Sequence, residues 1–82
     1  MNNLNVAKIQ LNGDPYEIND GTNLNDLLNK LKIQKNKVAI EVNGEIVEKN
    51  KYPNLILNKG DKVEIVQFIG GGLVYGRYFY YS

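Results

Sequence analysis

The sequence predicts an α+β fold in which a mixed β-sheet packs against one main helix. Two strand-and-turn units flank a single stretch of helical periodicity, and a strongly apolar strand pattern follows them. The chain has 82 residues, a length that suits one domain. Apolar residues make up 43% of it and charged residues 23%, which is typical of globular proteins, so we expect a packed core.

The first unit is a predicted β-hairpin. Apolar and polar residues alternate towards the end of Val6–Leu11, as expected for a strand with one buried face. Asn12-Gly13 follows, a pair that readily takes the positive φ angles of a tight turn. Residues 16–18 are the expected returning strand, and Asp20-Gly21 ends the unit with a second turn signal.

The next stretch changes to the period of a helix. Leucines three and four residues apart form one apolar stripe, which consists of Leu24, Leu27, Leu28 and Leu31. Asn23 is placed to cap the helix N-terminus, and Asp26 follows three residues later, as in a capping box. We expect the leucine stripe to pack against the sheet.

Four lysines gather at the far end of this predicted helix and just beyond it. They are Lys30, Lys32, Lys35 and Lys37. Cations are favoured at a helix C-terminus by the helix dipole. Because the net charge of the chain is only +1, we expect a solvated helix end rather than a patch for an anionic ligand.

The second half of the chain contains the remaining strands. Residues 38–42 are a β-prone run, and Asn43-Gly44 is a second hairpin signal. Pro53 lacks the N–H group that a central strand needs, so residues 52–57 are expected to form a turn or a short edge piece. The apolar pattern at residues 63–69 indicates a central strand. This element order fits a β-grasp fold, in which the first and last strands lie side by side and parallel.

The composition excludes several classes of site. The chain has no cysteine and no histidine, which removes disulfides, Cys/His zinc sites and catalysis by its own thiol or imidazole. Ten basic and nine acidic residues are too balanced for a domain that binds nucleic acid through its phosphates. No apolar run approaches the roughly 20 residues of a membrane-spanning helix, and the N-terminus lacks a secretory pattern. We therefore expect a cytoplasmic domain with no nucleic-acid or membrane partner and no bound metal, and not a self-sufficient enzyme.

Two sets of polar or aromatic side chains are weaker candidates for chemistry. Glu41, Glu45 and Glu48 lie around the second hairpin, where solvated carboxylates are favoured over an acid–base pair. Tyr16 and Tyr52 are expected to be packing or surface aromatics rather than ligands.

A glycine run, residues 70–72, follows the last predicted strand. It is a poor phosphate loop, because no Gly-Lys-Ser/Thr motif and no helix follow it. From its residues alone, a flexible linker is the favoured interpretation.

Together, residues 8–72 resemble the ThiS-type sulfur-carrier proteins of thiamine biosynthesis. The segments that carry the resemblance are Leu11-Asn12-Gly13, Asp26-Leu27-Leu28, and residues 38–47, 60–66 and 68–72. The resemblance implies a ubiquitin-like β-grasp fold and a carrier rather than an enzyme. It also implies that sulfur is attached at Gly72 and that Gly70 and Gly71 form the carrier arm. Phe68 and Ile69 would lie at the partner surface, although as apolar strand residues they fit the core equally well.

The family also implies a chemistry and partners. A ubiquitin-activating-like enzyme adenylates the terminal glycine carboxylate with ATP and Mg²⁺, and a persulfide then displaces AMP. The resulting thiocarboxylate gives its sulfur to thiazole synthase, so the carrier itself binds no cofactor. The small subunit of molybdopterin synthase shares this fold and a double glycine. Residues 63–69, however, lack the proline-containing approach to the glycines that is typical of that family.

The chain continues past the glycines, unlike ThiS-type proteins. Residues 73–82 contain five of the eight aromatic residues, and Gly72 has no carboxylate while an amide joins it to Leu73. We therefore divide the chain into a carrier domain, residues 1–72, and an extension, residues 73–82. The favoured hypothesis is a precursor trimmed after Gly72 by a peptidase. The alternatives are an extension without a role and a non-catalytic interaction module.

The composition of the extension predicts that it folds back on the domain. Its aromatic and β-branched residues favour an added edge strand or a dimer contact.

Overall fold

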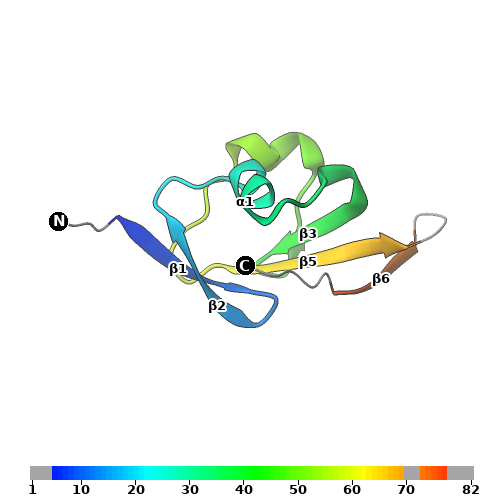
Figure 1. Cartoon of the computed structure of the whole chain (residues 1–82), viewed down its shortest axis with the longest axis horizontal. Coiled ribbons are helices and arrows are strands. Elements are labelled where there is room, and N and C mark those ends of the chain that lie inside the picture. Colours follow the sequence, from blue (N-terminus) through cyan, green and yellow to red (C-terminus); the bar gives the residue numbers. More distant parts are fainter. Residues whose placement is uncertain (1–4, 70–72, 78–82) are drawn as a thin grey trace.

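The computed structural model describes residues 5–69 and 73–77, and its elements follow the predicted order (Figure 1). The strands are β1 (Val6–Leu11), β2 (Asp14–Asn19), β3 (Val38–Val42), β4 (Glu45–Ile46), β5 (Lys62–Ile69) and β6 (Leu73–Arg77). The helical elements are α1 (Leu24–Leu31) and two 3₁₀ helices, η1 (Lys35–Lys37) and η2 (Lys49–Asn54). None of the helices in these residues has the length and apolarity to cross a membrane.

The sheet has the mixed topology that the sequence predicts. Its strands lie in the order β2-β1-β5-β3-β4, and β6 pairs with β5 outside this path. β1 and β5 are parallel neighbours, with Leu11 beside Val63, whereas β2 pairs with β1, and β3 with β5, in antiparallel register. The first and last strands of the carrier domain therefore lie side by side at the centre, which confirms the β-grasp arrangement.

The helix α1 begins at the predicted capping box. The Asn23 side chain accepts a hydrogen bond of 2.7 Å from the Asp26 N–H, and the Asp26 carboxylate accepts one of 3.3 Å from the Asn23 N–H. The leucine stripe faces the sheet, as predicted: Leu24, Leu27 and Leu28 are buried, and Leu31 is half-buried against the same core.

The core lies between α1, η2 and one face of the sheet. Its buried residues are Ala7, Ile9, Leu11, Ile18, Leu24, Leu27, Leu28, Ile33, Val38, Ile40, Tyr52, Leu57, Val63 and Ile65. All of them lie between positions 7 and 65.

The crossover between β4 and β5 is more ordered than the sequence predicts. Residues 49–54 form η2 rather than a turn, and only Ile56 makes an edge contact, an isolated bridge with Asn23. A short 3₁₀ helix tolerates Pro53 because few of its N–H groups have partners within the helix. The Asn23 amide also donates a 3.0 Å hydrogen bond to the Pro53 carbonyl, which fastens the crossover to the start of α1.

The extension folds back onto β5, as predicted. β6 runs antiparallel to β5, with Leu73 paired to Ile69, Val74 to Phe68 and Arg77 to Val66 (Figure 1). This confirms an added edge strand for residues 73–77. Residues 78–82 lie outside the described part of the chain.

Candidate functional site

The strand β5 carries the chain from the core to the glycine run. Its residues Val63 and Ile65 are fully buried, and β3 pairs with it over five consecutive residues, 63–67. β1 pairs only with Lys62 and Val63. The carboxyl half of β5 therefore extends past β1, to one end of the molecule in Figure 1.

The predicted partner residues lie in this carboxyl half. Phe68 and Ile69 are the last two residues of β5, and both pair with β6. Gly70, Gly71 and Gly72 lie outside the described residues, so the sulfur attachment point and the carrier arm stay predictions. The structure describes β5, the strand that leads to these glycines.

Two asparagine side chains hold β5 from its two sides. Asn12 and Asn43 both have left-handed backbone conformations, with φ of 51° and 54°, in the two Asn-Gly turns. The Asn12 side-chain oxygen accepts a 2.8 Å hydrogen bond from the Ile65 N–H, and its amide donates to the Ile65 carbonyl at 3.4 Å. The Asn43 oxygen accepts a 2.9 Å bond from the Lys62 N–H.

The sequence predicted these asparagines only as turn formers. An asparagine amide has both a donor and an acceptor, so it can pair with a strand as a peptide group does. Recurrence of asparagine at the same position of two turns is the one signal for this role, and it does not identify the partner strand. The bond between Asn12 and Ile65 joins residues 53 positions apart. A pattern of neighbouring residues does not predict a contact over that separation.

The acidic residues of the second hairpin do not form an acid–base pair. Glu41 lies opposite Ile46 and Glu45 opposite Val42, so the register places the two glutamates on opposite faces of the sheet. Glu45 and Glu48 are exposed, as predicted. In the part of the chain that the structure describes, no group of three or more Asp, Glu, His or Cys side chains is placed to hold a metal ion.

The lysines at the helix end are exposed, as expected for a solvated helix terminus. Lys30 turns back towards β2, with its ammonium nitrogen 5.1 Å from the centroid of the Tyr16 ring. The same nitrogen lies 3.5 Å from the Glu17 carbonyl oxygen. Tyr16 is half-buried against the core, which confirms it as a packing aromatic.

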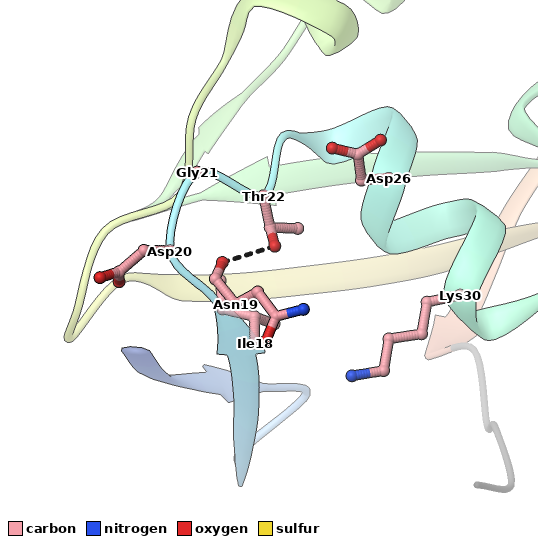
Figure 2. A pocket seen from close by; sticks show the side chains of 7 residues that line it. All are labelled: Ile18, Asn19, Asp20, Gly21, Thr22, Asp26 and Lys30. Atoms are coloured by element: carbon pink, nitrogen blue, oxygen red, sulfur yellow. Dashed lines mark hydrogen bonds between the residues drawn. The ribbon is translucent and has the colours of Figure 1, made fainter. Parts of the chain in front are cut away.

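A polar hollow of about 320 Å³ lies between the end of β2 and α1 (Figure 2). The Thr22 hydroxyl donates a 2.6 Å hydrogen bond to the Asn19 carbonyl, and Asp26 belongs to the capping box. Lys30 reaches towards Asn19 from α1 in Figure 2. These polar groups therefore have local roles in closing the turn and starting the helix.

A larger hollow of about 660 Å³ lies between β4, η2 and the turn before β5. Ile46 and Ile56 line it and are exposed by 71% and 45%. Asp61, just before β5, is also in its lining. This hollow is therefore at the amino end of β5. The first hollow also lies away from the carboxyl end of β5. It adjoins the end of β2, which pairs with the start of β1, and β1 is parallel to β5.

The buried Tyr52 is the one described residue whose pKa is clearly displaced. Burial raises the pKa of its phenol above the ordinary value, and the nearby Ile40 backbone opposes this only in part. The phenol side chain is fully buried, and its hydroxyl has no hydrogen-bond partner. Tyr52 lies in η2 within the core, so it is a packing residue, as predicted.

Comparison with known proteins gives consistent matches over the carrier domain. The ThiS family model matches residues 9–72. The sulfur carrier protein ThiS of Bacillus subtilis is 37% identical over 65 residues, which cover 78% of this chain and 98% of that protein. The crystal structure of the thiamine biosynthesis protein ThiS from Geobacter metallireducens superposes with a TM-score of 0.71 at 34% identity, covering 79% of this chain and 99% of that one.

A longer protein also contains a matching segment. A thiazole synthase from Magnetococcus marinus is 43% identical over 65 residues, which are 79% of this chain but only 20% of that protein. The chain thus spans about a fifth of the length of this thiazole synthase.

The family match and the structure agree on where the shared domain lies. The match begins within β1, contains the whole of β5 and ends at Gly72, the last residue of the glycine run. The similarity to the Geobacter metallireducens structure confirms the ubiquitin-like β-grasp fold. The chain belongs to the ThiS family of sulfur carriers.

Proposed function

We propose that this chain is a sulfur carrier of thiamine biosynthesis whose reactive group is the carboxylate of Gly72, freed by trimming of residues 73–82. The observation that carries the proposal is the end of the family match at Gly72, directly beyond a strand anchored in the core. The matched relative in Bacillus subtilis is named a sulfur carrier protein, and 65 residues of this chain cover 98% of it.

The proposed chemistry has three steps. A Gly72 carboxylate oxygen attacks the α-phosphorus of ATP, pyrophosphate leaves, and a glycyl adenylate forms. The terminal sulfur of a persulfide attacks the acyl carbon and AMP leaves. A thiol then cleaves the sulfur–sulfur bond, giving the thiocarboxylate and a disulfide. Adenylation helps because a carboxylate oxygen is a poor leaving group, and the covalent intermediate divides one difficult step into easier ones.

The architecture suits a protein that is a substrate of other enzymes. β5 is held on one side by five consecutive pairs with β3 and on the other by β1 and Asn12, so it forms a fixed base for the arm. Glycines in the arm have no Cβ, so a narrow enzyme channel can close around the backbone. Both hollows lie away from this end of the molecule.

The proposed partners follow from the same chemistry. An adenylating enzyme of the ubiquitin-activating type supplies ATP and Mg²⁺, and a peptidase first frees the Gly72 carboxylate. Thiazole synthase is the proposed sulfur acceptor, because the thiazole synthase of Magnetococcus marinus contains a segment similar to this chain. We place these reactions in the cytoplasm, where ATP is available.

Mass spectrometry of two chains tests the proposal. Chain 1–72, incubated with its adenylating enzyme, MgATP and a persulfide donor, should exchange one terminal oxygen for sulfur, whereas chain 1–82 should not. In protein from its native cells, a mass ending at Gly72 supports trimming. Failure of chain 1–72 to form either the adenylate or the thiocarboxylate would remove the main support for the carrier function.

A substitution in the arm provides the matched control. Gly71→Val in chain 1–72 should block thiocarboxylate formation, because the added side chain cannot pass through a channel shaped for bare backbone. Thermal unfolding should be unchanged, since the substitution leaves the core described within residues 7–65 intact. A Gly71→Val chain that is activated normally would contradict the predicted role of the arm.

A further inference from the structure

One edge of β5 is covered by three different segments in succession. β1 covers its start, where the Gln10 and Asn12 N–H groups donate 2.9 Å hydrogen bonds to the Asp61 and Val63 carbonyls. The Asn12 side chain then pairs with both backbone groups of Ile65. β6 covers the rest, from Val66 to Ile69. Only this last segment belongs to the extension.

The direction of the peptide groups shows what β6 covers. Asp61, Val63 and Ile65 turn their peptide groups to the β1 side, whereas the Lys62 carbonyl accepts a 2.7 Å hydrogen bond from Asn43 on the β3 side. Alternate residues of a strand bond to opposite neighbours. Gln67 and Ile69 therefore present their N–H and C=O groups to β6. A chain that ends at Gly72 would leave both of these residues unpaired on that edge.

The strand β6 is an imperfect occupant of this edge. Its pairing shifts by one residue between Val74, opposite Phe68, and Arg77, opposite Val66. Tyr75 and Gly76 consequently share the single position opposite Gln67, as in a β-bulge, which disrupts the ladder locally. By contrast, β3 pairs with β5 over five residues without a shift. The contacts that hold β6 are therefore fewer and easier to exchange than those that hold β3.

The edge that β6 covers also has a defined length. β6 runs towards the β1–β2 turn, and beyond its pairing at Val66 the next residue of β5, Ile65, is already bonded to Asn12. At the other end lies the glycine run. The open positions are thus only residues 66–69, directly before the proposed reactive arm.

We propose that the β5 edge at residues 66–69 is the docking site for an extended segment of the adenylating enzyme, and that β6 occupies this site in the full chain. Such a segment adds a strand to an exposed sheet edge through main-chain hydrogen bonds. The strand seated there indicates its chemistry: an uncharged, β-prone stretch such as Leu73-Val74-Tyr75. Trimming after Gly72 then does two things, since it frees both the carboxylate and the edge beside it. This inference rests on the proposed carrier function.

The docking and the chemistry can be separated with full-length variants. Tyr75→Pro removes a main-chain donor of β6 and fixes φ, so it should release β6 from β5. Tyr75→Val keeps the β propensity and is the matched control. Both variants keep the Gly72–Leu73 amide, so neither can be adenylated. Chain 1–72 can serve as the open reference, because it contains the whole core described within residues 7–65 and a 65-residue match covers 98% of the ThiS protein of Bacillus subtilis.

Binding of four chains to the adenylating enzyme tests the proposal. If β6 is detached from the edge in only about a tenth of the full-length molecules, the apparent affinity of chain 1–82 for the enzyme is about tenfold lower than that of a chain with an open edge. Chains 1–72 and 1–82 Tyr75→Pro should therefore bind about tenfold more tightly than chain 1–82 and its Tyr75→Val variant. In the complex with chain 1–72, amide exchange of Gln67 and Ile69 should slow down.

Three results would overturn the docking site. The first is equal binding by Tyr75→Pro and Tyr75→Val, and the second is unchanged exchange at Gln67 and Ile69 in the complex. The third is a stable dimer of chain 1–72 paired through this edge, which would assign it to a second copy. Thiocarboxylate formation on chain 1–72 would persist in each case, so these failures are distinct from failure of the carrier function.

Discussion

Two asparagines, Asn12 and Asn43, form tight turns and also bind β5 through their side chains. Both take a left-handed backbone conformation that asparagine tolerates better than most residues. The Asn12 amide pairs with both backbone groups of Ile65. The Asn43 oxygen accepts from the Lys62 N–H, whereas its amide nitrogen donates to the Asp61 carboxylate. The bond to Ile65 is partly buried, whereas the bond to Lys62 is exposed. A partly buried N–H that loses its partner costs more than an exposed one, because water cannot replace the bond.

This difference predicts unequal effects of glycine at the two turns. Asn12→Gly and Asn43→Gly both keep the left-handed backbone and remove the side chain. We expect Asn12→Gly to lower the free energy of unfolding by about 1 kcal/mol more than Asn43→Gly. Urea unfolding of both variants measures the difference. Equal losses would show that the bond to Ile65 does not contribute specifically to stability.

At Tyr52 the core contains a buried hydroxyl that has no hydrogen-bond partner. Tyr52→Phe keeps the ring and removes the buried, unpartnered oxygen, so stability at neutral pH should be unchanged or rise by up to about 1 kcal/mol. Tyr52→Ala should lose about 3–5 kcal/mol, because it leaves a cavity. Chemical unfolding at pH 7 distinguishes the two. A large loss in Tyr52→Phe would reveal a hydrogen bond at the hydroxyl.

The same residue predicts a dependence on alkaline pH. Burial raises the pKa of Tyr52 in the folded chain, so the unfolded chain loses this proton first as the pH rises. The resulting stability is fully present below about pH 10, the ordinary tyrosine value, and is lost as the pH rises from there to the folded pKa. Unfolding followed between neutral pH and pH 11 should show wild type losing stability relative to Tyr52→Phe. If the free energy of unfolding changed equally with pH in both chains, the predicted effect of the Tyr52 pKa would be contradicted.

At the scale of elements, local pattern predicted the helix and most of the strands. The leucine stripe and the capping box define α1, alternation before a turn signal defines β1, and a β-prone run before a turn signal defines β3. Each of these patterns involves residues that are close together in the sequence, so the sequence alone can predict them. The 3₁₀ helix η2 was missed because its order comes from distant contacts, the buried Tyr52 ring and the Asn23 bond to Pro53. For the candidate site, the sequence predicted the strand and the glycines, but not the asparagines that hold the strand.

The helix α1 allows a graded test of the core. Leu28→Ala removes a side chain that is only 2% exposed, so it should cost about 2–5 kcal/mol in the free energy of unfolding. Leu31→Ala, on the same stripe but half-buried, should cost clearly less. Thermal or urea unfolding measures both. A larger loss at Leu31 than at Leu28 would contradict the packing of the stripe.

At the scale of the whole molecule, the described core and the proposed reactive arm occupy different parts of the chain. Among residues 5–67, whose burial the structure describes, the buried residues lie between positions 7 and 65, and both ends of this range are in the central strands β1 and β5. The proposed reactive arm and the extension come after it. We therefore expect changes to the arm or to β6 to alter the proposed recognition and chemistry while the folded core is preserved.

Removal of the extension is the direct test of this separation. Chain 1–72 lacks β6, whose pairing partners are all within residues 66–69 of β5. The truncation therefore removes part of one edge ladder and keeps the core described within residues 7–65, the helix α1 and both asparagine bonds. We expect the free energy of unfolding of chain 1–72 to lie within about 1 kcal/mol of that of chain 1–82. Urea unfolding of both chains measures this, with Leu28→Ala as the reference for a true core change. A loss as large as that of Leu28→Ala would mean that β6 is part of the folding unit, and trimming after Gly72 would then have to unfold the carrier that it is proposed to activate.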